Sequence, residues 1–277
     1  MGTPKRERQK TNRQIRLQEL AHDARVAKTK RVGLRYGIGI PVVIAVLWGL
    51  VLLVNGGDDK VATPTTTTVT ATTVAPFPAP VTVPGATITG DTPCPEADGS
   101  SARTITFAQE PPMCIDTAKQ YEAVITTNKG SLTVALDAVK APINVNNFVV
   151  LARYHYFDNT QCHRIIPQFV GQCGDPTATG NGGPGYSVID ELPQQGEYQI
   201  GSLAMANSGS NTSGSQFFII SGANGAALPP NYSLFGMTTA GLDTVTAIDA
   251  AGNGDPSANG SPTLQQVIIE SVVINEL

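Results

Sequence analysis

Residues 156–186 read YFDNTQCHRIIPQFVGQCGDPTATGNGGPGY and contain the last basic residue of this 277-residue chain, Arg164. Beyond Arg164 there are nine acidic residues but no lysine or arginine. Phe169 and Gln172 follow it within eight positions. One cation among apolar and amide side chains is typical of a site for a neutral ligand, because a few polar groups suffice to orient a ligand in an apolar site. The sequence therefore predicts that this stretch binds neutral peptide.

A second block, GSLAMANSGSNTSGSQFFII at 201–220, is also uncharged. It offers apolar side chains that could hold a ring and amides that could hold a peptide backbone. The candidate contact residues are Met205, Ala206, Asn207, Gln216 and Phe218. The chain has three histidines and no GxSxG, HExxH or Walker-type motif, so the common hydrolase and nucleotide-binding signatures are absent. We expect no cofactor.

The cysteines indicate disulfide bonds. Cys94, Cys114, Cys162 and Cys173 are even in number, and four cysteines allow three pairings. Proximity in the sequence favours Cys94–Cys114 and Cys162–Cys173. Zinc is the alternative, because Cys162, His163 and Cys173 could supply three ligands, but no CxxC spacing supports it. We therefore predict two disulfides and no metal site.

The second of these cysteine pairs brackets the candidate site. A bond between Cys162 and Cys173 would close a hairpin and brace the two strands that present Arg164 and Gln172. Side chains alternate between the two faces of a strand. A regular hairpin therefore cannot place Arg164 opposite Gln172 and also Cys162 opposite Cys173. A β-bulge would resolve the conflict, and the sequence predicts an irregularity near Gly171.

The basic charge is concentrated at the start of the chain. Residues 1–35 carry eleven basic and three acidic residues, and the remainder carries seven basic and nineteen acidic ones. The run GIGIPVVIAVLWGLVLLV at 37–54 contains 18 uncharged residues, enough to cross a bilayer core of about 30 Å. No small-x-small cleavage pattern follows it, which favours an uncleaved transmembrane helix at 36–55 over a signal peptide. By the positive-inside rule, the head lies in the cytoplasm and the bulk of the chain lies outside the cell membrane.

The rest of the chain divides by composition. Residues 56–90 are rich in Thr and Pro and nearly uncharged, which predicts a disordered, extended linker; an O-glycosylated stalk is the alternative. Residues 91–118 contain two of the cysteines and predict a small disulfide-tied lead-in. The globular domain is expected at 119–277. Because membrane orientation already explains the basic head at 1–35, we expect no nucleic-acid partner for it.

The globular part shows the signals of many strands and two helices. β-rich runs on either side of 126–130 predict a hairpin. Pro142 precedes apolar residues at helical spacing, which predicts a helix from this position, and a second helix is expected at 242–250. Short β-rich segments separated by Gly, Asn and Pro fill the remainder. This pattern predicts a mainly β fold, either an antiparallel barrel or a sandwich.

Three blocks carry a family resemblance: residues 156–186, residues 201–219 and YSLFG at 232–236. Their order and spacing resemble those of the cyclophilin-type peptidyl-prolyl cis-trans isomerases over roughly 119–275. The resemblance implies a closed eight-stranded antiparallel β-barrel capped by two α-helices, here preceded by the transmembrane helix and the linker. It also implies an isomerase (rotamase) that accelerates rotation about X–Pro bonds, with proline-containing polypeptides as substrates. With its membrane segment, the chain resembles a membrane-anchored bacterial form that acts on exported proteins.

The resemblance also assigns roles to single positions. Arg164 matches the catalytic arginine, Phe169 the phenylalanine of the proline pocket, and Gln172 the glutamine that orients the arginine. Further substrate contacts are implied for Val170, Met205, Ala206, Asn207, Gln216, Phe218, Leu228 and Tyr232. Of these, Asn207 is expected to bind the peptide through its main chain.

Three positions depart from the family pattern. Val170 replaces a frequent methionine, Tyr232 a frequent histidine and Ala227 a frequent tryptophan. Because that tryptophan helps family members to bind cyclosporin, we expect weak cyclosporin binding here. The changes leave a second function open, a catalytically weak binding module or chaperone for proline segments. Retention of Arg164 and Gln172 favours the enzyme.

Overall fold

The computed structural model describes residues 84–255 and 258–277. The predicted basic head, the predicted transmembrane helix and the larger part of the predicted linker lie outside these ranges. Among the described residues, none of the helices combines the length and apolar character that a membrane crossing requires. The described residues therefore bear on the fold and the site, and the membrane anchor stays a prediction.

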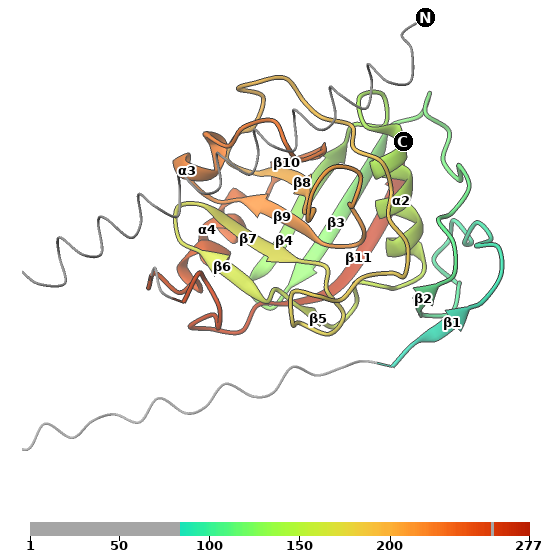
Figure 1. The fold of residues 1–277 in the computed structure, drawn as a ribbon, viewed down its shortest axis with the longest axis horizontal. Helices are drawn as coiled ribbons and strands as arrows, with labels where there is room; N and C mark the ends of the chain where they lie inside the picture. Colours follow the sequence, from blue (N-terminus) through green and yellow to red (C-terminus); the bar gives the residue numbers. More distant parts are fainter. Residues whose placement is uncertain (1–83, 256–257) are drawn as a thin grey trace, which may run out of the picture. The chain divides into compact units, whose positions relative to one another are not determined.

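A single curled antiparallel sheet forms most of the fold (Figure 1). Its strands are β3 (Tyr121–Thr127), β4 (Gly130–Leu136), β5 (Thr160–Gln161), β6 (Arg164–Ile166), β7 (Val170–Cys173), β8 (Ser202–Met205), β9 (Phe217–Ile220), β10 (Leu234–Ala240) and β11 (Ile268–Glu276). They hydrogen-bond in the order β5-β11-β3-β4-β10-β8-β9-β7-β6, so the two edge strands, β5 and β6, are neighbours in the sequence. The predicted hairpin at 126–130 is formed by β3 and β4. The prediction of a mainly β, antiparallel fold is confirmed.

The structure does not confirm a closed barrel of eight strands. Within the described residues the sheet has nine strands, and no ladder joins β5 to β6. Between these two strands, the backbone N–H of Cys162 donates to the carbonyl oxygen of Val267 over 2.9 Å. Residues 162 and 163 therefore belong to neither strand and separate β5 from β6.

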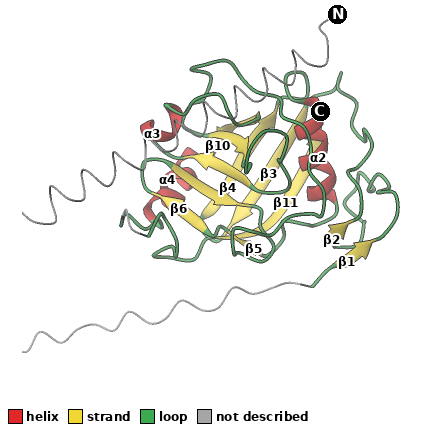
Figure 2. Cartoon of the chain, in the orientation of Figure 1, coloured by secondary structure: helices red, strands yellow, loops and turns green. Residues whose placement is uncertain are grey.

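Both predicted helices are present (Figure 2). The first, α2 (Pro142–Arg153), starts at a proline, whose fixed φ suits the first helical turn, and packs against β11. The second, α4 (Leu242–Ala250), packs against β4, β6 and β7. A short helix, α3 (Ala223–Ala226), is an addition to the prediction, because four residues are too few to show a helical period.

One hydrophobic core fills the interior of the sheet around Phe148, Phe157, Phe217 and Phe235. The ring centroid of Phe148, on α2, lies 5.0 to 5.5 Å from those of the other three. Burying a large apolar side chain of this kind contributes about 1.5–3 kcal/mol. Phe217 lies on β9 next to the candidate site residue Phe218, so this core also fixes the strand that carries the site.

The predicted lead-in belongs to the same folded unit as the sheet. Its strand β2 (Thr104–Phe107) pairs in parallel with β1 (Ala86–Ile88), which lies inside the predicted linker. Phe107 and Ile115 are buried in the core of the main sheet. The hydrophobic core therefore extends across the predicted boundary at residue 119, and regular structure begins before residue 90.

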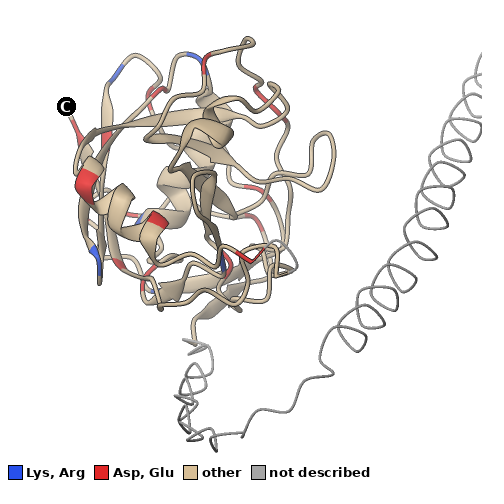
Figure 3. Cartoon of the chain, turned by 90° about the vertical axis from the view of Figure 1, so that its left-hand side faces the viewer, with Lys and Arg blue, Asp and Glu red and all other residues tan. Residues whose placement is uncertain are grey.

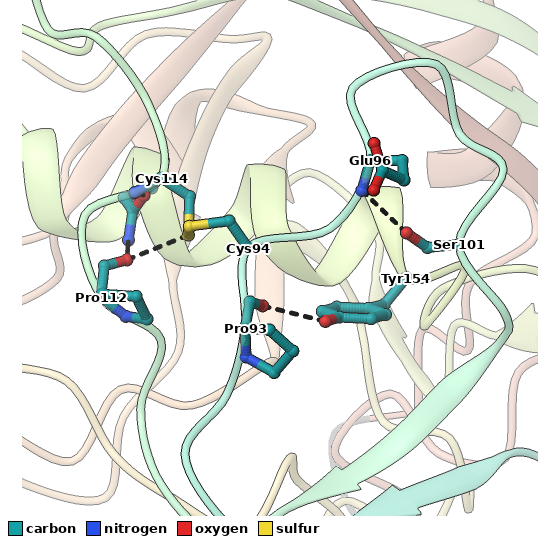
Figure 4. Close-up of a disulfide and its surroundings, with 8 residues drawn as sticks. Pro93, Cys94, Glu96, Ser101, Pro112, Cys114 and Tyr154 are labelled. Atoms are coloured by element: carbon teal, nitrogen blue, oxygen red, sulfur yellow. Dashed lines mark hydrogen bonds between the residues drawn. A yellow bond between two sulfur atoms is a disulfide. The ribbon is translucent and has the colours of Figure 1, made fainter.

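The predicted disulfide Cys94–Cys114 is present and closes the lead-in into a loop (Figure 4). Its two Cα atoms lie 5.4 Å apart. The hydroxyl of Tyr154 donates to the carbonyl oxygen of Pro93 over 2.9 Å, and the N–H of Cys114 donates to Asn146 Oδ1 over 2.7 Å. These bonds attach both ends of the loop to α2 and to the residue that follows it.

Candidate active site

The candidate site is built on the ladder between β6 and β7. Arg164 lies directly opposite Gln172, and the pairing continues without a shift to Ile166 opposite Val170. The predicted irregularity near Gly171 is therefore wrong. Because directly opposed residues of a ladder point to the same side of the sheet, the side chains of Arg164 and Gln172 come within hydrogen-bonding distance.

The second predicted disulfide, Cys162–Cys173, is also present, and its Cα atoms lie 4.0 Å apart. Cys162 precedes β6, and its N–H bonds to the carbonyl oxygen of Val267. It is therefore not part of the β6–β7 ladder, and its side chain does not follow the alternation of side chains along β6. The break between β5 and β6 thus resolves the conflict in register without a bulge. Because the two sulfurs are bonded to each other, neither is a thiolate that could bind zinc.

Three hydrogen bonds hold the guanidinium of Arg164. Its Nε donates to the carbonyl oxygen of Asn259 over 3.0 Å, and one terminal nitrogen donates to Asn259 Oδ1 over 3.1 Å. The other terminal nitrogen donates to Gln172 Oε1 over 3.2 Å. Each terminal nitrogen carries two N–H groups, so each retains one that has no partner within the described residues. The guanidinium is therefore fixed in orientation and still has donors for a ligand.

A chain of amides, which we call the amide relay (Gln172 and Gln216), continues from Arg164. Gln172 Nε2 donates to Gln216 Oε1 over 2.9 Å. Gln216 Nε2 donates to the carbonyl oxygens of Gly180, over 3.0 Å, and Gly182, over 2.8 Å. Backbone oxygens can only accept, so they determine which end of each amide is the nitrogen. The carbonyl oxygens of Gly180 and Gly182 thereby orient Gln216, which in turn directs the side-chain oxygen of Gln172 toward Arg164.

The charge of Arg164 has no acidic partner in the part of the chain that the structure describes. Burial lowers the pKa of its guanidinium, and the nearby phenol of Tyr232 offsets part of this shift. The group stays protonated, because arginine does not lose its proton in proteins. Lysine and arginine are sparse along the described chain (Figure 3). A half-buried cation of this kind favours a ligand that offers a lone pair.

A second hydrophobic cluster lies apart from the main core, on β7, β8 and β9, on the chain before β8 and between β9 and β10, and at the start of β10. We call it the apolar patch: its buried members are Val170, Tyr198, Ala204, Phe218 and Ile220, and its partly exposed members are Phe169, Ala206, Ala226, Leu228, Tyr232 and Leu234. The rings of Phe218 and Tyr232 meet edge to face, with centroids 5.2 Å apart. Gln172 pairs with Phe218 across the β7–β9 ladder, which places the patch on the strands that carry the amide relay. Partly exposed apolar groups next to fixed donors suit a ligand with an apolar ring.

The structure separates Met205 from the other predicted contact residues. Its side chain is 1% exposed and belongs to the main core. Its sequence neighbours Ala204 and Ala206 both belong to the apolar patch. Successive side chains of a strand point to opposite faces, so Met205 faces the core where its neighbours face the patch. Both faces of this strand are apolar, and the sequence pattern therefore does not distinguish them.

A cavity of about 600 Å³ adjoins the amide relay. It is lined by Gln172, Gln216, Ala206, Asn207 and the loop 180–187, among others. Backbone groups of glycines make up much of this loop, which suits binding of another polypeptide backbone.

Asn207 offers its main chain to this cavity. Its side chain is already used: Nδ2 donates to the carbonyl oxygen of Asn231 over 2.9 Å, and Oδ1 accepts from the N–H of Gly209 over 3.3 Å. Its main-chain N–H and C=O have no hydrogen-bond partner within residues 84–255 and 258–277. The expected contact through the main chain of Asn207 stays a prediction, and the geometry permits it.

Asp175 organises the glycine-rich loop and is absent from the predicted site residues. Its buried carboxylate accepts hydrogen bonds from the backbone N–H groups of Thr177, Thr179, Gly180 and Gly182. Burial raises the pKa of this carboxyl, but the hydrogen bonds from Thr177 and the glycines outweigh it and bring the pKa below its ordinary value. A Cβ on Gly182 would lie 1.9 Å from Asp175 Oδ1, so only glycine lets the loop close around the carboxylate. An acid followed by hydroxyl residues and glycines is the signal that could have indicated this loop.

Two further residues hold the site from distant parts of the chain. Asn259 binds the guanidinium of Arg164, as described above. Tyr198 fixes Tyr232: its hydroxyl donates to the carbonyl oxygen of Tyr232 over 2.6 Å and accepts from its N–H over 3.1 Å. Burial raises the pKa of Tyr198 to about 12, so the hydroxyl remains a donor at neutral pH. Neither contact has a local sequence signal.

A curled β-sheet that presents one fixed arginine, two oriented amides and an apolar patch is an arrangement suited to binding peptide. Residues 123–274 match the family model described as "Cyclophilin type peptidyl-prolyl cis-trans isomerase/CLD". This span includes every strand of the main sheet at least in part, and all of the site. The chain belongs to the cyclophilin-type peptidyl-prolyl cis-trans isomerase family.

Individual relatives agree with this assignment. "Probable peptidyl-prolyl cis-trans isomerase B" of Mycobacterium tuberculosis (strain ATCC 25618 / H37Rv) is 33% identical over 214 residues, which are 72% of this chain and 68% of that protein. The protein of the same name from Mycobacterium leprae (strain TN) is 39% identical over 166 residues, which are 54% of this chain and 55% of that protein. The chain thus matches about half the length of the M. leprae relative. The crystal structure of a cyclophilin type isomerase from Cryptosporidium parvum is similar with a TM-score of 0.51 and 32% identity, over 57% of this chain and 98% of that one.

Proposed function

We propose that the chain is a peptidyl-prolyl cis-trans isomerase that accelerates rotation about X–Pro bonds in polypeptides. Membership of the family supports this reaction, and the relatives compared above carry it in their names. The observation that carries the proposal is the guanidinium of Arg164, which Gln172 and Asn259 hold on the strands that also bear the apolar patch.

The reaction requires a donor rather than a nucleophile. A peptide bond resists rotation with a barrier of about 18–20 kcal/mol, because resonance stabilises the planar amide. In the twisted amide the proline nitrogen loses this conjugation and gains a lone pair. A donor that binds the twisted nitrogen more strongly than the planar one lowers the barrier, since catalysis depends on preferential binding of the transition state.

Arg164 has the properties that this role demands. It is always charged, and its N–H groups point in fixed directions from a planar group. Each terminal nitrogen retains one N–H that can donate to the twisted proline nitrogen. The partners Gln172 and Asn259 fix the orientation before a peptide binds, so little side-chain freedom is lost on binding. The apolar patch would hold the proline ring, and the main chain of Asn207 would hold the peptide backbone.

We also propose that the enzyme is a membrane-anchored bacterial form that acts on exported proteins. The predicted transmembrane helix at 36–55, the basic head at 1–35 and the Thr/Pro-rich linker support this location. The two disulfides support it as well, because disulfides persist mainly in oxidising compartments outside the cytoplasm.

The test is prolyl isomerisation of a short Ala-Pro peptide by the full chain, purified in a mild detergent. Arg164→Ala should lower the rate by about 10²–10³-fold, by analogy with the loss of one oxyanion-hole donor. Arg164→Lys keeps the charge but loses the fork of donors, so it should also be slow. Lys129→Ala, which removes a cation from the β3–β4 hairpin far from the relay in the sequence, is the matched control and should keep full activity.

Circular dichroism would show that each variant is folded. A folded, oxidised wild-type protein that does not accelerate isomerisation would refute the catalytic proposal. The alternative, a proline-peptide-binding module or chaperone, would then be tested by titrating the same peptide in an NMR experiment. Equal rates for the wild type and Arg164→Ala would assign catalysis to another group.

A further inference from the structure

The lead-in touches the wall of the cavity that adjoins the amide relay. The N–H of Phe107 donates to the carbonyl oxygen of Pro184 over 2.8 Å. A Cβ on Gly185, whose φ is 108°, would lie 2.4 Å from the carbonyl oxygen of Phe107. Pro184 and Gly185 both line the cavity of about 600 Å³. The backbone of Phe107 therefore lies directly behind this part of the wall.

The side chain of Phe107 is enclosed by three tyrosines. It is 1% exposed, and its ring centroid lies 5.4 Å from that of Tyr154, 6.5 Å from that of Tyr156 and 6.1 Å from that of Tyr186. Protein interiors are close-packed, so an enclosed ring has no free space into which it can shift. The position of Phe107 therefore constrains all three tyrosines, of which Tyr186 lines the cavity.

Two of these tyrosines, Tyr156 and Tyr186, are linked by hydrogen bonds to a second segment of the cavity wall, at residues 214–215. The hydroxyl of Tyr186 donates to Asn147 Oδ1 over 2.7 Å, and Asn147 Nδ2 donates to the carbonyl oxygen of Gly214 over 2.7 Å. The hydroxyl of Tyr156 shares a hydrogen bond of 2.9 Å with Ser215 Oγ. Gly214 and Ser215 line the cavity and immediately precede the second amide of the relay in the sequence.

The two wall segments also depend on each other. A Cβ on Gly214 would lie 3.2 Å from Pro184 Cδ, so the segment at 214–216 and the loop 180–187 pack closely. The same loop accepts both hydrogen bonds from Gln216 Nε2. A shift of the loop at Pro184 and Gly185, away from the lead-in, would therefore change the shape of the cavity, while the hydrogen bonds from Gln216 to Gly180 and Gly182 keep the relay in place.

We propose that the lead-in is part of the peptide-binding machinery and that Phe107 is a positioning residue for the cavity. Phe107 holds the loop 180–187 against the segment 214–216 and so sets the affinity for peptide residues that flank the X–Pro bond and lie in the cavity. This proposal rests on the proposed isomerase function. The lead-in lies outside residues 123–274, the span that matches the family model. Such a residue should affect long peptides and spare short ones.

The experiment compares the short Ala-Pro peptide with peptides extended by several residues on the amino or the carboxyl side, using the full chain. Phe107→Leu should lower kcat/KM roughly fivefold for one of the extended peptides, a size typical of mutations that act through a packed network. The loss should appear in KM, while kcat and the rate for the short peptide stay within about twofold. Phe235→Leu is the matched control, because Phe235 is buried in the same core but packs on Phe148 and Phe217. It should affect all the peptides equally.

Hydrogen exchange supplies a structural measurement. Amides of the loop 180–187 should exchange faster in Phe107→Leu and at the wild-type rate in Phe235→Leu. If Phe107→Leu does not fold, Gly185→Ala tests the same contact, because its Cβ would displace the loop from the carbonyl oxygen of Phe107. An equal loss for short and extended peptides, or no loss for any of them, would overturn the proposal.

Binding measurements separate this proposal from the isomerase function. If the wild type binds an extended peptide but does not accelerate its isomerisation, the isomerase function fails and the Kd of that peptide decides the role of Phe107. Weaker binding to Phe107→Leu than to Phe235→Leu would support the positioning role, and equal Kd values would refute it. A wild type that neither binds nor isomerises any of these peptides would overturn both proposals.

Discussion

Gln172 lies opposite Arg164 on the neighbouring strand and accepts a hydrogen bond of 3.2 Å from its guanidinium. The charged group and the group that orients it therefore come from one short hairpin. Asn259 holds the guanidinium from its other side, and the disulfide Cys162–Cys173 ties the chain next to both strands. The rigidity of this hairpin should consequently bear on activity as well as on stability.

Removal of either disulfide should reduce stability, but only one of them should control activity toward a short peptide. Cys162 and Cys173 are separated by 11 positions, and Cys94 and Cys114 by 20. Cross-links of this span contribute about 3 kcal/mol each in the chain-entropy model. Only the Cys162–Cys173 bond lies on the hairpin of Arg164. A misplacement of a catalytic side chain by about 1 Å can reduce a rate by a large factor. We expect a rate loss of roughly tenfold from removal of this bond.

The paired variants Cys162→Ser/Cys173→Ser and Cys94→Ser/Cys114→Ser test this difference. Chemical denaturation should give similar losses in the free energy of unfolding, and isomerisation of the Ala-Pro peptide should fall only in the first. Similar activity in both variants would show that the bond next to Arg164 does not position it.

Gly182→Ala should destabilise the protein and slow the reaction, whereas Gly183→Ala should do neither. A Cβ on Gly182 would lie 1.9 Å from the carboxylate of Asp175, but a Cβ on Gly183 would meet no atom within 4 Å. Overpacking of this kind costs about 1–3 kcal/mol. The displaced loop would also lose the hydrogen bond from Gln216 to Gly182.

Thermal unfolding and the rate for the Ala-Pro peptide would be measured for both glycine variants. A stable but slow Gly182→Ala would show that the loop acts chiefly through the amide relay. Unchanged behaviour of Gly182→Ala, or equal effects at both positions, would contradict the role assigned to the carboxylate of Asp175.

The part of the site that is close in sequence was predictable, and the part that is distant was not. Arg164 and Gln172 stand in one hairpin, and the family resemblance of this block assigned Arg164, Phe169 and Gln172 to one site. Asn259 and Tyr198 reach the site only because the sheet curls, and no local period or motif reports that curl. Contacts between residues this far apart depend on the packing of the whole core.

The difference between local signals and distant contacts also explains the errors in the predicted fold. The two longer helices follow from a proline start and a helical period, which are local signals. The break at residues 162–163 and the inward side chain of Met205 depend on which strand pairs with which. The order of strands decides the face that a side chain occupies, and an apolar strand such as β8 does not show its own register in the sequence.

His155 should remain protonated to a higher pH than an ordinary histidine. Its Nδ1 lies 2.8 Å from Asp158 Oδ2, and its Nε2 lies 2.8 Å from the carbonyl oxygen of Gly99 in the lead-in. Both partners accept, so both bonds require the doubly protonated ring. The bond to Gly99 and then Asp158 raise the pKa of His155, against the opposing effects of burial and of Arg103.

The sign of the pH dependence follows from this shift. Because the folded pKa lies above the unfolded value of about 6.5, the stabilising contribution is complete below about pH 6.5 and is lost as the pH rises through the folded pKa. Burial lowers the pKa of His163, so that histidine contributes in the opposite sense.

NMR titration of the two ring resonances would give both values directly. Thermal unfolding of the wild type and of His155→Gln should differ most below about pH 6.5 and converge above the folded pKa of His155. A difference that grows with pH, or a pKa of His155 below that of His163, would contradict the contact with the lead-in.

Ala227→Trp should strengthen inhibition by cyclosporin, which we expect to be weak for the wild type. Ala227 is exposed at the end of α3 and precedes Leu228, a member of the apolar patch. An aromatic side chain at this position would extend the patch, and a buried tryptophan removes about 150–250 Å² from water. We expect inhibition at least roughly tenfold stronger, corresponding to about 1.4 kcal/mol of added binding free energy.

Ala223→Trp is the matched control, because Ala223 is exposed on the same short helix but does not belong to the apolar patch. Inhibition constants for cyclosporin would be measured on the short Ala-Pro peptide, whose turnover should change little in either variant. If Ala223→Trp gains as much as Ala227→Trp, the effect comes from a general increase in apolar surface. If neither variant gains, the bound drug does not reach α3, and the weak binding expected for the wild type has another cause than Ala227.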